Sequence, residues 1–137
     1  NNEEKHLKDS KSIINQSEAA IATSIAKFYL GTGINPKDIG IISPYADQVN
    51  LIQDKIPIEV KSVDGFQGRE KEIIIISTVR SNIGFLKDLR RLNVAITRAK
   101  RKLIVIGNKN TLKGNSTYSK LIKFCAKNDL LINFRHT

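Results

Sequence analysis

The sequence predicts an α/β fold in which a mainly parallel sheet is covered by helices on both faces, giving three layers. Several short segments are continuously apolar, including residues 39–42, 73–76 and 103–106. Continuous apolar runs are typical of strands that are buried on both faces of a parallel sheet. Segments with helical spacing separate most of these runs, and such alternation indicates helices on either side of the sheet.

The first predicted helix begins at a capping motif. Asn15 and Glu18 have the spacing of a capping box, in which Asn15 caps the helix and Glu18 reaches back to it. Apolar residues follow at helical spacing, and two glycines are expected to end the helix: Ile21, Ala22, Ile25, Phe28 and Tyr29, then Gly31 and Gly33.

A turn at residues 36–38 leads into the predicted strand at 39–42. Ser43 is then expected to cap a second helix, with Pro44 at its favoured first position. Val49 and Ile52 would face inward from this helix, and a strand is expected near residues 58–62.

The second half of the chain is expected to continue the alternation. Its predicted elements are a strand at 73–79, a helix at 89–100, a strand at 103–106, a helix at 118–127 and a strand at 130–134. The residues expected to be most buried are Ile41, Ile74, Ile76, Ile104 and Val105.

Length and composition indicate a single domain. Residues 1–14 are polar and charged, so we expect a flexible N-terminal segment followed by one domain over residues 15–137. No apolar run approaches the roughly 18–20 residues that a bilayer span needs, so no membrane association is expected. The single Cys125 cannot form an internal disulfide, which favours an intracellular compartment, cytoplasmic or nuclear.

The charge distribution favours a polyanionic partner. The chain carries a net charge of +10, and residues 100–137 hold nine Lys or Arg against the single acid Asp129. Such an imbalance usually indicates nucleic acid, although a basic surface that only aids solubility would look similar.

Two segments have features of an anion-facing site. Residues 63–70, Val-Asp-Gly-Phe-Gln-Gly-Arg-Glu, have the composition of a phosphate-facing loop. Arg98 lies near the end of the predicted 89–100 helix, where it could reach across a cleft to an anionic group. The alternative is that this helix merely needs a solvated basic face.

Three blocks in series carry a family resemblance. They are residues 42–48 (ISPYADQ), residues 62–72 (SVDGFQGREKE) continuing through 77–82, and residues 84–86 with 90–100 (RRLNVAITRAK). In this order the blocks resemble the second RecA-like domain of superfamily-one helicases, in the branch with the nonsense-mediated-decay helicase and senataxin. The resemblance covers roughly residues 15–108.

The resemblance implies a RecA-like domain, which is a P-loop NTPase fold without its own P-loop. It assigns Arg98 the role of an arginine finger, which stabilises charge on the transferring phosphoryl group and is worth about 10³–10⁵ in rate. By the same resemblance Gln67, Gly68 and Glu70 approach the nucleotide, although Gly68 could simply form a tight turn.

A single strand of RNA or DNA is expected to bind at the other edge of the sheet. The residues that the resemblance assigns to it are Pro44, Tyr45, Ser62, Val63 and Arg80. A helix N-terminus after Pro44 would offer free N–H groups to phosphate. Tyr45 could instead be a core aromatic, and backbone contacts do not distinguish RNA from DNA.

Two motifs of a complete motor are absent from this chain. It contains no G-x-x-x-x-G-K-[ST] loop and no D-E-x-x magnesium motif, which the family carries on its first RecA-like domain. ATP and Mg²⁺ would therefore be held in the full-length enzyme, with no metal site and no tight nucleotide binding expected here. The chain would be half of a motor, working with the first RecA-like domain of the same polypeptide and inactive alone. The alternatives are a non-catalytic nucleic-acid-binding module with this fold, or a different α/β nucleotide-binding protein.

Overall fold

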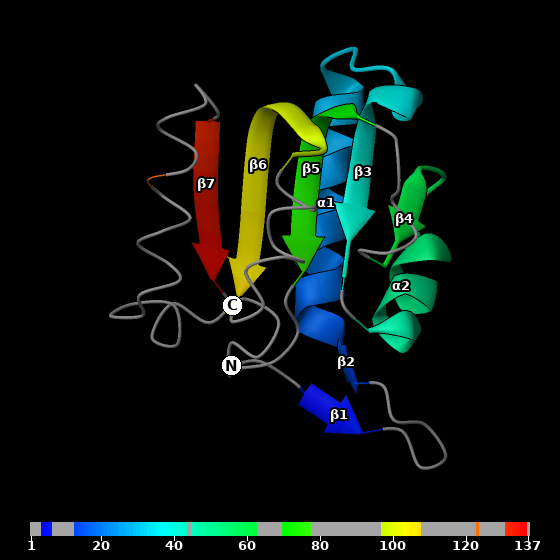
Figure 1. Cartoon of the computed structure of the whole chain (residues 1–137). Coiled ribbons are helices and arrows are strands. Elements are labelled where there is room, and N and C mark those ends of the chain that lie inside the picture. The colour runs from blue at the N-terminus through cyan, green and yellow to red at the C-terminus, as the bar shows by residue number, and fades with distance from the viewer. Residues whose placement is uncertain are drawn as a thin grey trace.

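The computed structural model describes residues 4–6, 13–43, 45–62, 70–77, 97–107, 123 and 131–136. Its centre is a five-stranded sheet with the order β4-β3-β5-β6-β7 (Figure 1). The strands are β3 (Ile39–Ile42), β4 (Glu59–Lys61), β5 (Lys71–Ser77), β6 (Ala99–Gly107) and β7 (Leu131–His136). Every neighbouring pair in this sheet is parallel, which confirms the predicted sheet type.

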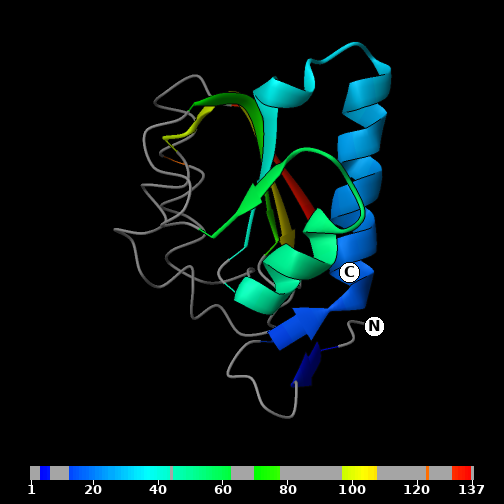
Figure 2. The ribbon, with the colours of Figure 1, turned by 90° about the vertical axis from the view of Figure 1, so that its right-hand side faces the viewer.

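Helices α1 (Gln16–Gly31) and α2 (Ala46–Gln53) flank this sheet, and the 3-10 helix η1 (Pro36–Asp38) occupies the predicted turn. Figure 2 shows α1 running along one face of the sheet. The residues of α1 that pack onto the sheet are small, Ala19, Ala22 and Ala26, and each is fully buried. Small side chains allow the helix to lie close to the strands, where isoleucines supply the volume of the core.

Both faces of the sheet are buried, as the three-layer prediction requires. Ile41, Ile75 and Ile104 share a layer with α1, and they are paired in register across β3, β5 and β6. The alternate residues of the same strands point to the opposite face and are also fully buried, namely Ile42, Ile74, Ile76, Leu103 and Val105. The five residues predicted to be most buried are all at most 1% exposed.

The start of α1 confirms one half of the predicted capping box. Asn15 Oδ1 accepts a hydrogen bond from the backbone N–H of Glu18 at 3.0 Å. The reciprocal contact takes a different form, because the backbone N–H of Asn15 donates to Gln48 Oε1 at 2.9 Å. The Glu18 carboxylate instead accepts from the hydroxyl of Ser77, so tertiary partners replace the local one.

The end of α1 is where the glycines were expected, and one of the apolar residues at helical spacing is exposed. Thr32 caps the helix and Gly33 follows with a φ of 102°, a left-handed conformation that favours glycine. Phe28 is 65% exposed, because the row of small alanines, and not the row of large residues, faces the sheet. Its ring packs edge-on against Tyr29 with 5.2 Å between the ring centroids.

The second helix begins later than predicted. The N-cap of α2 is Tyr45 and the helix starts at Ala46, whereas the sequence suggested Ser43 as the cap. Ser43 still belongs to the sheet region, since its backbone N–H donates to the carbonyl of Lys61 at 3.2 Å. Ile52 is fully buried as expected, and Pro44 lies outside the described residues.

The prediction of a helix through Lys100 is wrong at its end. Thr97 and Arg98 lie in a turn, and β6 already begins at Ala99. Pairing with β5 decides this boundary, because Lys71 pairs with Ala99 and a helix cannot supply that ladder. Residues 89–96 of the predicted helix lie outside the part of the chain that the structure describes.

The remaining predictions agree where they can be compared. β4, β5 and β7 lie at the expected strands, and β5 begins two residues earlier than the predicted 73–79. Of the predicted 118–127 helix, only Lys123 is described, and it is helical. No helix among the described residues is both long and apolar enough to cross a bilayer.

A small second sheet precedes α1. Strands β1 (Glu4–His6) and β2 (Ile13–Asn15) pair antiparallel, with Lys5 opposite Ile14. These strands lie within or just after the segment expected to be flexible, and a domain boundary at residue 15 stays a prediction. Asn15 ends β2 and caps α1, so the two elements are joined without a linker.

Candidate functional site

Parallel strands give the sheet two chemically distinct edges. We call the edge at which the strands begin the start edge, and the edge at which they end the end edge; β3, β5, β6 and β7 point toward the end edge at the bottom of Figure 1. Glu70 and Arg98 directly precede the neighbouring strands β5 and β6, so both lie at the start edge. Tyr45 and Ser62 follow β3 and β4, so both lie at the end edge.

Four of the nine predicted site residues can be located in this way. The structure places Glu70 and Arg98 at the start edge, and it places Tyr45 and Ser62 at the end edge. The other predicted residues fall outside the described ranges: Pro44, Val63, Gln67, Gly68 and Arg80.

At the start edge, a backbone hydrogen bond holds Arg98 beside β5. The N–H of Lys71 donates to the carbonyl of Arg98 at 2.7 Å, and Lys71 immediately follows Glu70 in the chain. The Arg98 side chain is half-buried, and its Nε has no hydrogen-bond partner among the described residues. A buried donor without an acceptor costs about 1–3 kcal/mol, so an anionic group at this position would be stabilising.

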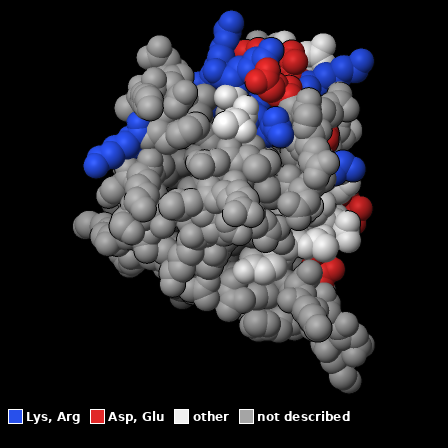
Figure 3. Space-filling view, in the orientation of Figure 1, with Lys and Arg blue, Asp and Glu red and all other residues white. Residues whose placement is uncertain are grey.

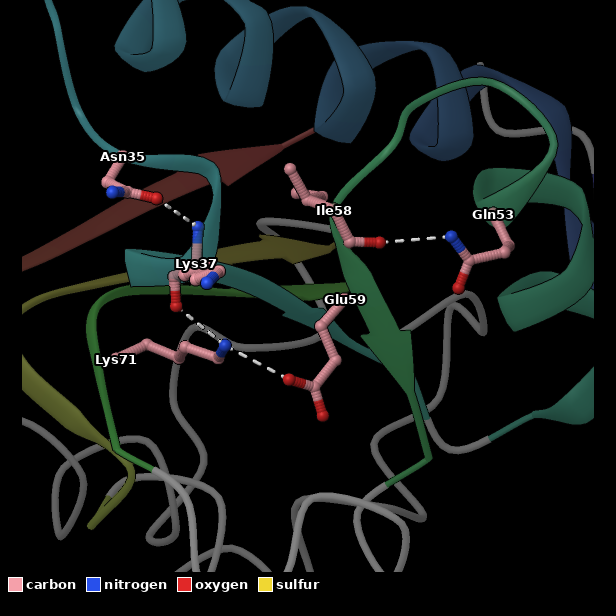
Figure 4. Close-up of polar contacts among 6 residues, drawn as sticks. All are labelled: Asn35, Lys37, Gln53, Ile58, Glu59 and Lys71. Atoms are coloured by element: carbon pink, nitrogen blue, oxygen red, sulfur yellow. Dashed lines mark hydrogen bonds and ion pairs between the residues drawn. The ribbon is translucent and has the colours of Figure 1, made fainter.

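Lys71 anchors the strand that carries this bond. Its side chain is 3% exposed, and its ammonium group donates to the carbonyl of Lys37 at 2.7 Å and pairs with Glu59 Oε1 at 3.0 Å (Figure 4). Asn35 in turn caps η1 by accepting from the N–H of Lys37 at 2.9 Å. The first residue of β5 is therefore tied to η1 and to β4 as well as to Arg98.

A bulge follows Arg98 in β6. Lys71 pairs with Ala99 and Ile73 pairs with Lys102, so β6 has one more residue than β5 between these pairs. Bulges occur often beside functional sites, where the extra residue redirects neighbouring side chains. Arg101, within the bulge, forms an ion pair with Glu72 at 2.9 Å on the surface.

The start edge is rich in charges of both signs. Figure 3 shows the Lys, Arg, Asp and Glu side chains of the described residues gathered at the top, over the strand starts. The exposed ones directly before or at the start of strands are Lys37, Asp38, Glu70, Lys100 and Arg101. The surface at the strand starts therefore carries charges of both signs.

The end edge carries polar groups around the first turn of α2. The N-cap residue Tyr45 makes no side-chain capping hydrogen bond, so that turn keeps N–H groups without this partner. Ser43 is fully buried, and its hydroxyl has no hydrogen-bond partner within the described ranges. Ser62 is half-buried on the neighbouring strand end.

A buried polar network lies behind these groups, and the sequence analysis missed it. Asn15, Glu18, Gln48 and Ser77 are all fully buried. The Gln48 amide bonds both the N–H and the carbonyl of Asn15, at 2.9 and 3.1 Å, and donates to the Ser77 hydroxyl at 3.3 Å. That hydroxyl donates to Glu18 at 2.6 Å. The available signal was polar residues at positions that face a core: Gln48 in a short amphipathic helix and Ser77 at the end of an apolar strand.

Comparison with protein-family models matches residues 1–110 to a family described as an AAA domain, AAA_12. The chain belongs to the AAA_12 family. Its members form the C-terminal RecA-like part of superfamily-one helicases, so the resemblance carried by the three sequence blocks is confirmed, and with it the RecA-like fold.

Among three curated relatives of this AAA_12 domain, the names of two include an ATP-dependent helicase. It is 50% identical over 127 residues to an uncharacterized ATP-dependent helicase of Methanocaldococcus jannaschii, covering 88% of this chain and 19% of the relative. It is 42% identical over 137 residues to the Regulator of nonsense transcripts 1 homolog of Drosophila melanogaster, covering 88% of the chain and 12% of the relative. It is 46% identical over 121 residues to the DNA replication ATP-dependent helicase/nuclease DNA2 of Xenopus laevis, covering 80% of this chain and 12% of the relative.

The AAA_12 domain thus spans a fifth or less of the length of these relatives, at 19%, 12% and 12%. The described residues include no cluster of three or more His, Cys, Asp or Glu side chains that could hold a metal ion.

Proposed function

We propose that this chain is the C-terminal motor half of an ATP-dependent RNA or DNA helicase or translocase. In this role it supplies the arginine finger, Arg98, and part of the track for a single strand. The observation that carries the proposal is the start edge: the Arg98 carbonyl is bonded to the residue after Glu70, and Arg98 Nε lacks a partner within the described ranges.

Arg98 would act on the γ-phosphoryl group of ATP that is bound mainly by the first RecA-like domain. The guanidinium is planar and stays protonated, so it can donate two parallel hydrogen bonds to phosphate oxygens as negative charge develops there. A free Nε on a half-buried side chain fits this chemistry, because a phosphate oxygen would complete its hydrogen bonding. Gln67, Gly68 and Glu70 would contact the ribose and phosphates of the same nucleotide.

The metal ion of the reaction would be held elsewhere. Bound Mg²⁺ would neutralise negative charge on the phosphate groups of ATP. The donor set in the described part of this chain does not fit a metal, since it lacks a cluster of acidic or imidazole ligands. Magnesium and the triphosphate would therefore depend on the first RecA-like domain, which we propose as the intramolecular partner.

The end edge would contact single-stranded RNA or DNA. Pro44, Tyr45, Ser62, Val63 and Arg80 would form this part of the track. Support comes from the uncapped first turn of α2 and from the buried Ser43 hydroxyl without a partner in the described residues, because free donors at a helix N-terminus bind phosphate. The net charge of +10 would add a sequence-independent attraction to the strand. We further propose an intracellular location, consistent with a single Cys125.

The proposal is tested by comparing this chain with the complete protein that contains it. The complete protein should hydrolyse ATP faster when single-stranded nucleic acid is added, whereas this chain alone should bind the strand and show no turnover. A complete protein that binds single strands without any ATP hydrolysis would instead identify the chain as a non-catalytic nucleic-acid-binding module.

A further inference from the structure

The buried network at the end edge uses all the hydrogen-bonding groups of one side chain, the amide of Gln48. Its Oε1 accepts from the N–H of Asn15, while its Nε2 donates to the carbonyl of Asn15 and to the hydroxyl of Ser77. The hydroxyl of Ser77 then gives its own proton to Glu18 Oε1. The hydrogen bonds therefore run in one direction, in which Gln48 donates to Ser77 and Ser77 donates to Glu18. The amide of Gln48 supplies both the acceptor for the Asn15 N–H and the donors for the Asn15 carbonyl and for Ser77.

The network joins three elements that are distant in sequence. Asn15 and Glu18 lie at the start of α1, Gln48 lies in the first turn of α2, and Ser77 is the last residue of β5. Gln48 and Asn15 are 33 positions apart, and Ser77 and Glu18 are 59 apart. Gln48 is bonded to Asn15 at the start of α1 and to Ser77 at the end of β5.

Two of these elements lead directly into the proposed strand track. Gln48 is three residues after Tyr45, on the turn whose N–H groups would meet a phosphate. Ser77 is three residues before Arg80, and it ends the strand that the Arg80 segment follows. The bond between Gln48 and Ser77 therefore fixes the first turn of α2 relative to the last residue of β5.

We propose that Gln48 is a positioning residue for single-strand binding, which sets the first turn of α2 against the end of β5. This inference rests on the proposed function, because it concerns the same track. Gln48 is fully buried, so we assign it no direct contact with the nucleic acid. It acts by holding the donors of the track at a fixed spacing, so that they meet phosphates of one strand without reorganisation.

The chain contains a matched control in the same helix. Gln53, at the far end of α2, also bonds through its side-chain amide to backbone, donating to the carbonyl of Ile58 at 3.0 Å (Figure 4). This bond ties α2 to the segment before β4 and lies away from the end edge of β5. Replacing either glutamine removes an amide that joins α2 to another element, but only Gln48 joins α2 to the end of β5.

The experiment uses the full chain with a fluorescently labelled oligouridine in low salt, and compares Gln48→Ala with Gln53→Ala. Both variants should melt at a lower temperature than the wild type. At a temperature where both are folded, Gln48→Ala should bind the oligonucleotide about tenfold more weakly, equal to about 1.4 kcal/mol, whereas Gln53→Ala should bind like the wild type. The salt dependence of Gln48→Ala should keep the wild-type slope, because the cations that release counterions are unchanged.

The outcomes separate the inference from the function on which it rests. Wild-type chain that does not bind the oligonucleotide would refute the proposed track, and with it this inference. Wild-type binding together with equal affinity of folded Gln48→Ala would refute the positioning role alone. If Gln48→Ala does not fold, Ser77→Ala decides in the same way, because it removes the link to β5 and keeps both bonds between Gln48 and Asn15.

Discussion

At the scale of single residues, the charged groups of the start edge differ in how much water they meet. Lys71 is 3% exposed and its partner Glu59 is 18% exposed, whereas Arg101 is 81% exposed in its pair with Glu72. The two ion pairs have nearly the same length, at 3.0 and 2.9 Å. Burial, and not distance, should therefore decide which pair matters for stability.

We predict that Lys71→Met lowers the free energy of unfolding by about 1–3 kcal/mol, because it removes the buried hydrogen bond to the carbonyl of Lys37 and the ion pair with Glu59. Arg101→Met should change it by about 1 kcal/mol or less, as an exposed pair contributes little. Urea denaturation of both variants measures the difference. Equal effects of the two substitutions would mean that the Lys71 pair is no more than a surface contact.

The residue scale also separates what a local motif predicts from what it does not. The Asn15 cap was predicted because it depends on residues three positions apart. The partner of Glu18 was predicted wrongly, because Ser77 lies 59 positions away and nothing local points to it. Hydrophobicity and helical spacing alone did not show that Phe28 is exposed, because the adjacent row of alanines allows a closer approach to the sheet.

At the scale of elements, two glycines at the end of α1 differ in backbone conformation: Gly31 is helical, and Gly33 has a positive φ. Gly31 is the last residue of the helix, and Gly33 follows it with a φ of 102°. A Cβ atom added at either position meets nothing within 4 Å. Packing therefore does not distinguish the two positions, and only backbone conformation does.

We predict that Gly31→Ala raises the free energy of unfolding by about 0.5–1 kcal/mol, because alanine restricts the unfolded chain and is compatible with a helix. Gly33→Ala should lower it by about 1 kcal/mol, because an L side chain is strained at a positive φ. Thermal melting of the two variants gives the sign of each change. A loss of stability from both substitutions would mean that α1 does not end as described.

Strands were predicted more accurately than helix boundaries, for a physical reason. A strand buried on both faces has to be apolar throughout, so β3, β5 and β6 were visible as runs of isoleucine, valine and leucine. The starts of α2 and β6 were missed because neighbouring strands decide them: Ser43 bonds to Lys61, and Arg98 bonds to Lys71. These two corrections lie beside the two candidate sites.

At the scale of the whole molecule, the length of the strands separates the proposed nucleotide residues from the proposed nucleic-acid residues. The start edge holds Glu70 and Arg98, and the end edge holds Tyr45 and Ser62. The family resemblance predicted that the nucleotide residues and the nucleic-acid residues would lie at opposite edges, and the roles of these four residues stay predictions. Sequence order and parallel topology were insufficient to predict the Lys71 anchor or the Gln48 network, because both depend on contacts between residues more than 20 positions apart.

We predict that this chain alone binds single-stranded RNA or DNA weakly and in a salt-sensitive manner. On single strands, the logarithm of affinity should fall with the logarithm of salt concentration by about 0.7 for each phosphate neutralised. Fluorescence anisotropy over a series of salt concentrations measures this slope. An affinity that does not change from low to moderate salt would remove the contribution expected from the basic residues 100–137.

We also predict that the purified chain does not turn over ATP. The sequence has no P-loop, and its described residues lack a cluster that could hold a metal ion, so neither the triphosphate nor Mg²⁺ has a full set of ligands here. A steady-state phosphate-release assay tests this directly. Turnover that persists through successive purification steps would contradict the assignment of the chain as half of a motor.

The most direct test of the account is the ATPase rate of Arg98 variants in the complete enzyme. Arg98→Ala should reduce turnover by about 10³ or more, since it removes the proposed finger from the transition state. Arg98→Lys should restore little, because an ammonium group cannot reproduce the planar fork. Melting temperature and single-strand affinity should stay near the wild-type values, because the Arg98 Nε makes no hydrogen bond to the described residues. A variant that is destabilised, and whose remaining folded fraction hydrolyses ATP at the normal rate, would contradict the assignment.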